Sequence, residues 1–422
     1  MHKLTVLLLL LTFFPFASRA NEGDSIGTVS ATSQLPPTSD LPMRVELRKL
    51  GIDITEGNEV ELLPSGQEKF DDLFAEIGQA RSFVHLEYFN FRNDSIANLL
   101  FDLLEKKVKE GVEVRAMYDA FGNWSNNQPI KRRQHNEIRQ RGINLVKYDP
   151  LTFPWVNHII PRDHRKIVVI DGKVGYTGGM NVADYYIKGT EVVGSWHDMH
   201  AHIEGPAVNR LHQIFTNIWK KETKEVIEGE LYFPQPVRAG DKEVAIIDRC
   251  AGKTSKNIRR LYVTMLNSAQ RSVKIINPYF VPTHSIRRAL KKAIKRGVDV
   301  QIMLSLKSDI PLTPDASFYV GNNLMKRGAK VYLYKGGFHH TKVMMVDSLY
   351  CTVGSANLNS RSLRYDYEIN TVVFSQETTR QLLDIFNRDV RHSDMMLRGW
   401  WRKRTFGQRF LGWFGNLLTP FL

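Results

Sequence analysis

The segments HRKIVVID at His164–Asp171 and HTKVMMVD at His340–Asp347 decide the fold. In both, a histidine is followed two residues later by a lysine and seven residues later by an aspartate, with apolar residues between the lysine and the aspartate. Seven residues after each aspartate begins a run of small residues that ends in asparagine, GGMN at Gly178–Asn181 and GSAN at Gly354–Asn357. Two matching copies of so specific a pattern indicate an internal duplication.

The duplication extends beyond these motifs. RSFVHLEYF at Arg81–Phe89 is echoed by RSVKIINPYF at Arg271–Phe280. Gly111, which precedes the next β-type run of the first copy, recurs 186 residues later as Gly297. A repeat of this length is a duplicated domain rather than the unit of a solenoid.

Within each copy, apolar runs of strand length alternate with segments of helical periodicity such as 95–109. This alternation is typical of α/β layered sheets. We therefore predict an α/β protein of two duplicated α/β/α sandwich domains, 46–226 and 227–395, that pack face to face about a pseudo-two-fold axis. Prolines and a glycine in 227–241 mark the join.

The first 20 residues have the parts of a secretory signal peptide: a basic start, an apolar run from Leu4 to Phe16, and small residues before a cleavage point after Ala20. The apolar run is shorter than the roughly 20 residues that a membrane-spanning helix needs. We predict a cleaved signal peptide at 1–20, with an uncleaved anchor as the alternative, and a flexible linker at 21–45. The expected location is the periplasm or the outer face of the cytoplasmic membrane.

The C-terminal segment 396–422 combines the basic cluster Arg402–Arg404 with aromatic and leucine residues at helical spacing. This composition suits a helix that lies in the bilayer interface, with its cations near anionic headgroups. The formal net charge of +14 also favours anionic partners, although charge alone does not distinguish a membrane from nucleic acid. We predict a basic amphipathic membrane-interface tail, and the alternative is a helix packed on the protein's own core.

The repeated motifs carry the candidate chemistry. A histidine and a lysine two positions apart on a strand project from the same face, which places a nucleophile beside a phosphate-binding cation. The aspartate seven residues after the histidine would face the other way, so we expect it to pin the strand end. The predicted catalytic residues are His164, Lys166, Asp171, His340, Lys342 and Asp347; the predicted substrate phosphate-binding residues are Asn181 and Asn357; the predicted histidine-orienting residues are Asp198 and Glu368.

Neither a metal site nor a cofactor is predicted. The histidines lack the closely spaced partner ligands of zinc sites, and Cys250 and Cys351 match no pair motif. An exported protein could join these two cysteines, but sequence spacing cannot establish the short Cα separation that a disulfide requires. Two free thiols are therefore the default expectation.

Taken together, these motifs resemble the phospholipase D superfamily, whose defining feature is His-x-Lys-x4-Asp in two copies. The resemblance runs from about Glu59 to the C-terminus and is strongest to bacterial cardiolipin synthases. It implies that a neutral His164 attacks phosphorus while a protonated His340 gives its proton to the leaving oxygen, so that a phosphatidyl-histidine forms. The runs that carry the resemblance are LEYF at 86–89, YDAFG at 118–122, RDHRK at 162–166, NPYFVP at 277–282 and NLNSRS at 357–362.

The resemblance implies transfer of a phosphatidyl group from one phosphatidylglycerol to a second phospholipid, with release of glycerol. The second lipid is phosphatidylglycerol, with phosphatidylethanolamine as the alternative. Cardiolipin synthases typically begin with two membrane-spanning helices, which one signal-like segment replaces here, and this chain has Asn359 where they tend to carry Asp and Asp366 where they tend to carry Asn. These departures concern the choice of lipid rather than the class of reaction.

Two other functions remain open. The same motifs serve hydrolases, either a phospholipase D or a phosphodiester nuclease. Nucleic acid is not the expected partner, because a nuclease would leave the apolar tail without a purpose. A non-catalytic lipid-binding protein is disfavoured because it would need neither histidine.

Overall fold

The computed structural model describes residues 41–153, 160–252, 254–310 and 313–419. The predicted signal peptide and most of the predicted linker lie outside the described residues. The linker boundary at residue 45 is wrong, because helix α2 (Pro42–Lys49) begins four residues before the predicted start of the first domain. Proline at the first helical position suits a helix start, and Met43 and Leu47 are fully buried.

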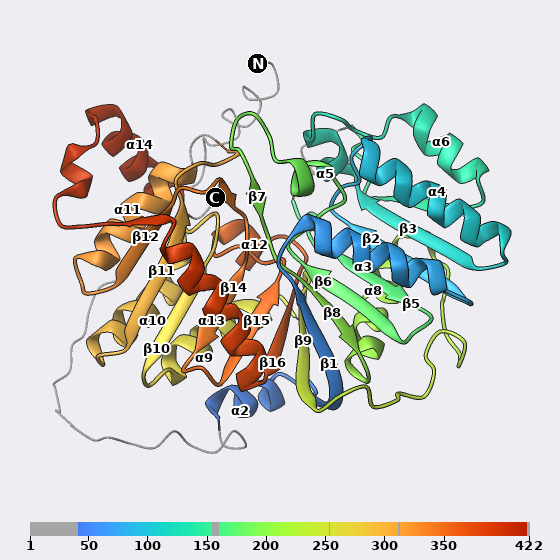
Figure 1. Cartoon of the computed structure of the whole chain (residues 1–422), viewed down its shortest axis with the longest axis horizontal. Helices are drawn as coiled ribbons and strands as arrows, with labels where there is room; N and C mark the ends of the chain where they lie inside the picture. Colours follow the sequence, from blue (N-terminus) through green and yellow to red (C-terminus); the bar gives the residue numbers. More distant parts are fainter. Residues whose placement is uncertain (1–40, 154–159, 253, 311–312, 420–422) are drawn as a thin grey trace. The chain divides into compact units, whose positions relative to one another are not determined.

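One sheet of fifteen strands runs through the described residues (Figure 1). Its centre is the pairing of β1 (Thr55–Leu63) with β9 (Lys242–Arg249). Outward from β1 lie β8 (His200–Glu204), β6 (Val174–Gly178), β5 (Ile167–Ile170), β2 (Phe83–Tyr88), β3 (Glu113–Asp119) and β4 (Asn144–Tyr148). Outward from β9 lie β16 (Glu368–Phe374), β15 (Tyr350–Gly354), β14 (Val343–Val346), β10 (Ser272–Ile276), β11 (Asp299–Ser305), β12 (Lys330–Tyr334) and β17 (Ser393–Met395).

The two halves of this sheet repeat each other. β2, β3 and β4 are mutually parallel and β2 is antiparallel to β5, and β10, β11, β12 and β14 have the same relations. The predicted duplication is thereby confirmed. The face-to-face packing is wrong: the two copies meet edge to edge through β1 and β9, so that one sheet continues from one copy into the other.

Helices cover both faces of the sheet because the strands are buried on both sides. Along β5, Ile167 and Val169 pack with α8, whereas Val168 and Ile170 pack with α3 and α4 on the opposite face. The helices of the first copy are α3 (Gly66–Gln79), α4 (Ser95–Lys109), α5 (Ala120–Ser125), α6 (Arg132–Gln140), α7 (Tyr185–Lys188) and α8 (Ala207–Thr223). Those of the second are α9 (Asn257–Ser268), α10 (His284–Lys295), α11 (Thr313–Met325), α12 (Ser360–Arg364) and α13 (Gln376–Val390).

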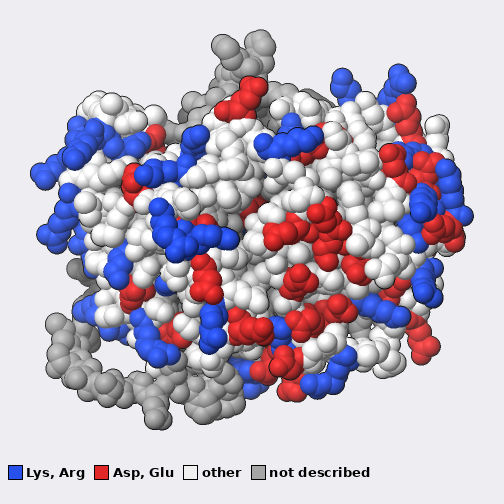
Figure 2. Space-filling model, viewed as in Figure 1, with Lys and Arg blue, Asp and Glu red and all other residues white. Residues whose placement is uncertain are grey.

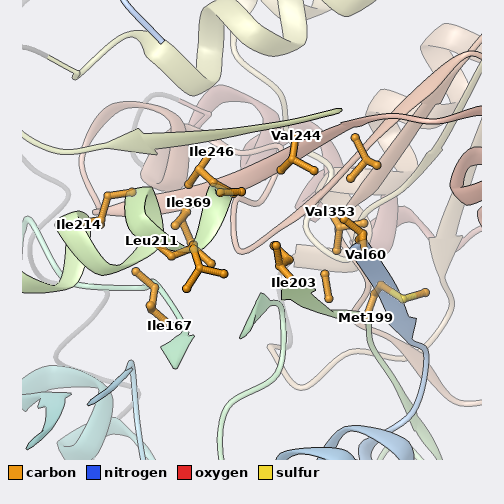
Figure 3. Packing of buried hydrophobic residues seen from close by; sticks show 14 of the residues in the cluster. Val60, Ile167, Met199, Ile203, Leu211, Ile214, Val244, Ile246, Val353 and Ile369 are labelled. Carbon is orange, nitrogen blue, oxygen red and sulfur yellow. The ribbon is translucent and has the colours of Figure 1, made fainter. Parts of the chain in front are cut away.

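A single hydrophobic core joins the two copies (Figure 3). It contains Val60 and Ile203 from the first copy together with Val244, Val353 and Ile369 from the second. The described chain clusters as one compact unit for the same reason. The copies are therefore repeats within one folding body, and the predicted join at 227–241 falls between α8 and β9.

The C-terminal segment forms a short 3-10 helix η3 (Trp400–Lys403) and helix α14 (Phe406–Leu417). α14 packs closely on α11 through Gly412 and Gly415, where any side chain would collide with Asp315 or Ala316. Its other face is open: Phe406 is 78% exposed, and Phe410, Leu411, Trp413, Phe414 and Leu417 are also exposed. No helix in the part of the chain that the structure describes is long and apolar enough to cross a bilayer. Cys250 and Cys351 are both free, as expected.

Candidate active site

The two repeated motifs meet where the copies exchange backbone. β7 (Trp196–His197) of the first copy pairs in parallel with β13 (Phe338–His339) of the second in a separate small sheet. The backbone N–H of His340 donates to the carbonyl of His197 at 2.6 Å, and that of His164 donates to the carbonyl of Tyr367 at 3.0 Å. Each histidine is therefore anchored on the backbone of the opposite copy.

The side chain of each histidine also contacts a carboxylate of the opposite copy. Nδ1 of His164 lies 3.1 Å and 3.2 Å from the two carboxylate oxygens of Glu368, and Nδ1 of His340 lies 2.6 Å from Oδ2 of Asp198. The structure thus brings both predicted carboxylates to a histidine, each to the one of the other copy. Because Nδ1 faces a carboxylate in both cases, Nε2 is the nitrogen that each histidine can offer to a substrate.

Both lysines of the motifs are fully buried beside the histidines. Nζ of Lys166 donates to the carbonyl of His164 at 2.5 Å, and Nζ of Lys342 donates to that of His340 and lies 3.7 Å from Oδ2 of Asp198. Burial lowers the pKa of Lys166 to about 7 and that of Lys342 to about 8. A bound anion would raise the pKa of both lysines, because it offsets the cost of burying their charge. Both lysines would then stay protonated.

The two carboxylates differ in charge. Burial raises the pKa of Glu368 to about 7. Burial also opposes ionisation of Asp198, but Lys342 and His340 together outweigh it, and the pKa of Asp198 is lower than usual. At neutral pH His340 therefore faces an ionised carboxylate, whereas the carboxyl group beside His164 is partly protonated.

Both histidines are neutral near pH 7. Burial, reinforced by Lys166 and Lys342, lowers the pKa of His164 well below its usual value. Burial, reinforced by Lys342, lowers the pKa of His340 to about 4, while Asp198 opposes that shift. A phosphate anion bound between the lysines would raise the pKa of both histidines. The rise would favour protonation of His340 most directly, because His340 already faces the ionised Asp198.

The two predicted phosphate-binding asparagines are buried at the same edge of the sheet as the lysines. Asn181 follows β6 and Asn357 follows β15, the strands that pair with β5 and β14. The side-chain oxygens of both are buried without a hydrogen-bond partner. An amide oxygen accepts, so it would take a donor such as a substrate hydroxyl, whereas the amide nitrogen of each side chain is the atom that can donate to a phosphate oxygen.

The structure does not bring Asp171 and Asp347, which were predicted as catalytic, to this site. They lie at the far ends of β5 and β14, where each carboxylate accepts three backbone N–H groups. For Asp171 the donors are residues 81–83, at 2.8–2.9 Å, and for Asp347 they are residues 270–272, at 2.7–2.8 Å. These aspartates pin the start of β2 and β10, which is the strand-end role that the seven-residue spacing favours.

Sequence patterns missed the walls of the site. The ring of Phe89 lies 5.0 Å from that of His164, and the rings of Trp196, Tyr279 and Phe338 lie 5.4–5.8 Å from that of His340. Phe89 and Tyr279 belong to the repeated segments, and this repetition was the only feature of the sequence that could have pointed to them. Ser355 also contributes, because its hydroxyl donates to Oε2 of Glu368 at 2.5 Å and so fixes the carboxylate.

One group of potential metal ligands occurs among the described residues. Glu61, Asp72 and His202 offer atoms within 4.8 Å of one another. Nδ1 of His202 is already hydrogen bonded to Asp72 at 3.0 Å, and no predicted catalytic residue belongs to the group. The surface that Figure 2 shows carries both acidic and basic patches.

Comparisons with known proteins agree with this geometry. Residues 73–219 and 262–390 match the family model described as "Cardiolipin synthase, PLD-like domain". The chain is 35% identical over 379 residues to "Probable cardiolipin synthase YwiE" of Bacillus subtilis (strain 168), an alignment that covers 89% of this chain and 75% of the relative. A cardiolipin synthase of Oceanobacillus iheyensis is 34% identical over 87% of this chain and 76% of its own length.

Among solved structures, the phosphatidylserine synthase of Haemophilus influenzae Rd KW20 has the same fold. It superposes with a TM-score of 0.67 at 14% identity and covers 90% of this chain and 100% of its own. At that identity the likeness speaks for the fold alone. On its sequence relatives, its duplicated fold and its paired motifs, the chain belongs to the cardiolipin synthase family of phosphatidyltransferases within the phospholipase D superfamily.

Proposed function

We propose that this protein is a cardiolipin synthase that transfers a phosphatidyl group from one phosphatidylglycerol to a second phospholipid and releases glycerol. The observation that carries the proposal is the exchange of carboxylates between copies. It sets two imidazoles, with buried lysines beside them, in the arrangement that a phosphodiester exchange needs: one base to attack phosphorus and one acid for the leaving oxygen.

In the first step Nε2 of His164 attacks phosphorus. The bond from phosphorus to the glycerol oxygen breaks, and His340 gives its proton to that oxygen, so that glycerol leaves and a phosphatidyl-histidine remains. Two features support these roles. Asp198 is ionised and lies 2.6 Å from His340, so it favours an imidazolium there once a bound phosphate offsets the effects of burial and Lys342, whereas His164 is kept neutral and nucleophilic.

In the second step the neutral His340 removes a proton from a hydroxyl group of the second lipid. The oxygen attacks phosphorus, and the phosphorus–nitrogen bond to His164 breaks. The charge that grows on the phosphoryl oxygens in both steps falls between Lys166, Lys342, Asn181 and Asn357. Preorganised donors of this kind contribute most in a buried site, because they need no reorganisation when the charge develops.

We further propose that the enzyme works on an anionic membrane surface, on the periplasmic side or the outer face of the cytoplasmic membrane. Support comes from α14, whose open face carries Phe406, Phe410 and Trp413. Lys and Arg side chains gather over the same region in Figure 2. An apolar face flanked by cations suits the headgroup region of an anionic bilayer. The proposed side of the membrane rests on the signal-like sequence at 1–20.

The test is to incubate the purified full-length protein with vesicles of phosphatidylglycerol labelled in the phosphatidyl group and in the glycerol, and to resolve the products. Cardiolipin and free glycerol in equal amounts are expected. With phosphatidylethanolamine present, a mixed product would identify the second lipid. Phosphatidic acid as the main product would make the enzyme a hydrolase and contradict the proposal.

A further inference from the structure

A polar cavity of about 410 Å³ lies in the first copy, between the start of α4, the loop at 127–128 and the end of α7. This volume is within the usual range of small-molecule sites. Its walls offer two cations, two carboxylates and uncharged hydrogen-bonding groups, with few apolar side chains, so it suits a hydrophilic headgroup rather than an acyl chain. The wall residues used below are Arg92, Asn127, Gln128, Tyr185, Lys188 and Thr190.

The cavity lies on the His340 flank of the active site. The ring of Tyr185, which forms one wall, is 4.3 Å from that of Trp196, and the ring of Trp196 is 5.5 Å from that of His340. In an in-line exchange the attacking His164 occupies one side of phosphorus. The leaving oxygen and the incoming oxygen both occupy the other side, next to His340.

Arg92 is the cation that the cavity leaves available. Its guanidinium carbon lies 5.1 Å from the centre of the Tyr185 ring, and one terminal nitrogen donates to Oδ1 of Asn127 at 2.5 Å. Its Nε is buried and makes no hydrogen bond. Oδ2 of Asp94 lies 3.8 Å from this Nε, so the two groups form an ion pair that is too long for a hydrogen bond and leaves the Nε donor unused.

The two carboxylates of the cavity are already committed. Asp94 accepts the N–H of Ala97 at the start of α4 and the N–H of Asp184, and Asp184 in turn accepts the N–H of Ile96 and the ammonium of Lys188. These contacts use both carboxylates to cap the amino end of the 15-residue helix α4, and Asp184 also pairs with Lys188.

Arg92 is not repeated in the second copy. The N–H of Arg92 donates to the carbonyl of Val182, and at the equivalent place of the second copy the N–H of Val281 donates to the carbonyl of Leu358, both at 3.0 Å. A valine thus stands in the second copy where the first has the arginine. The duplication supplies two equivalent histidines, but a cation at this position exists on the His340 flank alone.

We propose that this cavity binds the glycerophosphate headgroup of the second, accepting phospholipid, with Arg92 holding its phosphate. The inference rests on the proposed function and specifies which side of the site receives the second lipid. With its phosphate at Arg92, the lipid presents a free hydroxyl to His340. That hydroxyl loses its proton to His340 as its oxygen bonds to phosphorus and the bond from phosphorus to His164 breaks.

The test measures how the phosphatidyl-histidine partitions between the second lipid and water. On labelled phosphatidylglycerol vesicles, Arg92→Gln is expected to lower the ratio of cardiolipin to phosphatidic acid by about tenfold, the effect of losing one charge-assisted hydrogen bond. Arg92→Lys should recover part of the ratio. Arg133→Gln, which removes an 87% exposed arginine of α6, should leave it unchanged. An unchanged ratio in Arg92→Gln would overturn the proposal.

A second measurement separates this inference from the proposed function. Soluble sn-glycerol 3-phosphate, titrated calorimetrically into the wild-type protein, should bind, and binding should be lost in Arg92→Gln and kept in Arg133→Gln. If the wild type makes no cardiolipin, the proposed function fails while this titration still tests the cavity. A ratio that depends on Arg92 without binding of the soluble compound would assign the cavity to a headgroup presented by a bilayer. Binding that survives in Arg92→Gln contradicts the inference.

Discussion

His164 and His340 have nearly identical motifs but different carboxylate partners, and this difference supports the roles that we propose for them. His164 faces a glutamate whose pKa is about 7, and His340 faces an ionised aspartate. The proposed reaction needs one neutral and one protonated imidazole. The different charges of Glu368 and Asp198 make the two histidines unequal, although their motifs are repeats of each other.

The roles can be distinguished with a substrate whose leaving group needs no proton. With phosphatidyl-p-nitrophenol, His340→Ala should still form a phosphatidyl-histidine, because nitrophenolate leaves unaided. With phosphatidylglycerol the same variant should lose about 10²- to 10⁴-fold in kcat, the usual contribution of a general acid. His164→Ala should form no covalent intermediate with either substrate, and mass spectrometry of the intact protein provides the measurement. An adduct on His340 in the His164→Ala variant would reverse the assignment.

The pKa values of the site predict a bell-shaped dependence of kcat/KM on pH. As pH rises through about 7 to 8, Lys166 and Lys342 lose their protons and with them their attraction for phosphate. As pH falls below about 7, Glu368 becomes protonated and no longer holds the Nδ1 proton of His164. Assays in mixed micelles between about pH 5 and about pH 9 should therefore show a maximum between these limbs.

Glu368→Gln is the matched variant for the acidic limb. The amide cannot titrate, so the limb should move or vanish while the alkaline limb stays where it is. An acidic limb identical to that of the wild type would show that another group causes it.

Asp171 belongs to the same motif as His164, but we expect it to stabilise the fold rather than to take part in the reaction. Removing its carboxylate in Asp171→Ala leaves three backbone N–H groups without an acceptor. The free energy of unfolding should fall by about 1–3 kcal/mol, and thermal unfolding followed by circular dichroism measures it. At a temperature where the variant is folded, kcat should stay within a few-fold of the wild type. A loss of kcat as large as that of His164→Ala would return Asp171 to the catalytic group.

The residue pattern predicted most of the site. It could not predict contacts that depend on how distant parts of the chain pack together. Two motifs with small-residue runs identified the histidines, lysines and asparagines, because these must follow particular strands to meet. Asp198 and Glu368 could be named from sequence, but their exchange between copies depends on how two sheets join. Arg92 gave no signal, since nothing in the local sequence distinguishes an arginine in the wall of a cavity from one on the open surface.

At the scale of the element, α14 shows why a helix can be predicted when its packing cannot. Aromatic residues and leucines lie at helical spacing nearly all around it, so the spacing indicated a helix without indicating which side faces the protein. Gly412 and Gly415 decide this, because only glycine allows the close approach to α11. α2 was missed for the opposite reason: it is short and begins in a polar stretch, and its burial against the rest of the protein makes it a helix.

The open face of α14 predicts how the protein binds membranes. Phe410→Ser with Phe414→Ser should lower partitioning onto anionic vesicles by at least about tenfold, since each ring contributes by burial in the interface. Neither residue packs into the core, so the unfolding temperature should hardly change. Leu99→Ser, which removes an exposed leucine of α4, is the control and should bind vesicles like the wild type. Equal sedimentation of all three proteins with vesicles would exclude α14 as the contact.

At the scale of the whole molecule, the duplication predicted two domains, and the structure joins them into one body. The strand order repeats as the sequence repeats. The edge-to-edge junction through β1 and β9 and the common core of Figure 3 depend on contacts between residues far apart in the chain, which no periodicity reports.

The shared core predicts that the halves complement each other but do not work apart. Val237 is 74% exposed in the segment between α8 and β9, so a chain divided there should reassemble when both parts are co-expressed. The reassembled protein should form cardiolipin, and either part alone should show no turnover, since each lacks a carboxylate for its own histidine. Size-exclusion chromatography with a lipid assay measures both outcomes. Turnover by one part alone would contradict the exchange.

The exchange of carboxylates also means that the active site cannot be complete before the two copies have packed together. Until the second copy has closed on the first, His164 has no Glu368 and His340 has no Asp198, so a half-folded chain possesses neither a directed nucleophile nor a directed acid. Such a chain can touch phospholipid without cutting it. Competence to break a phosphodiester bond is therefore expected only in a chain whose two copies have already joined.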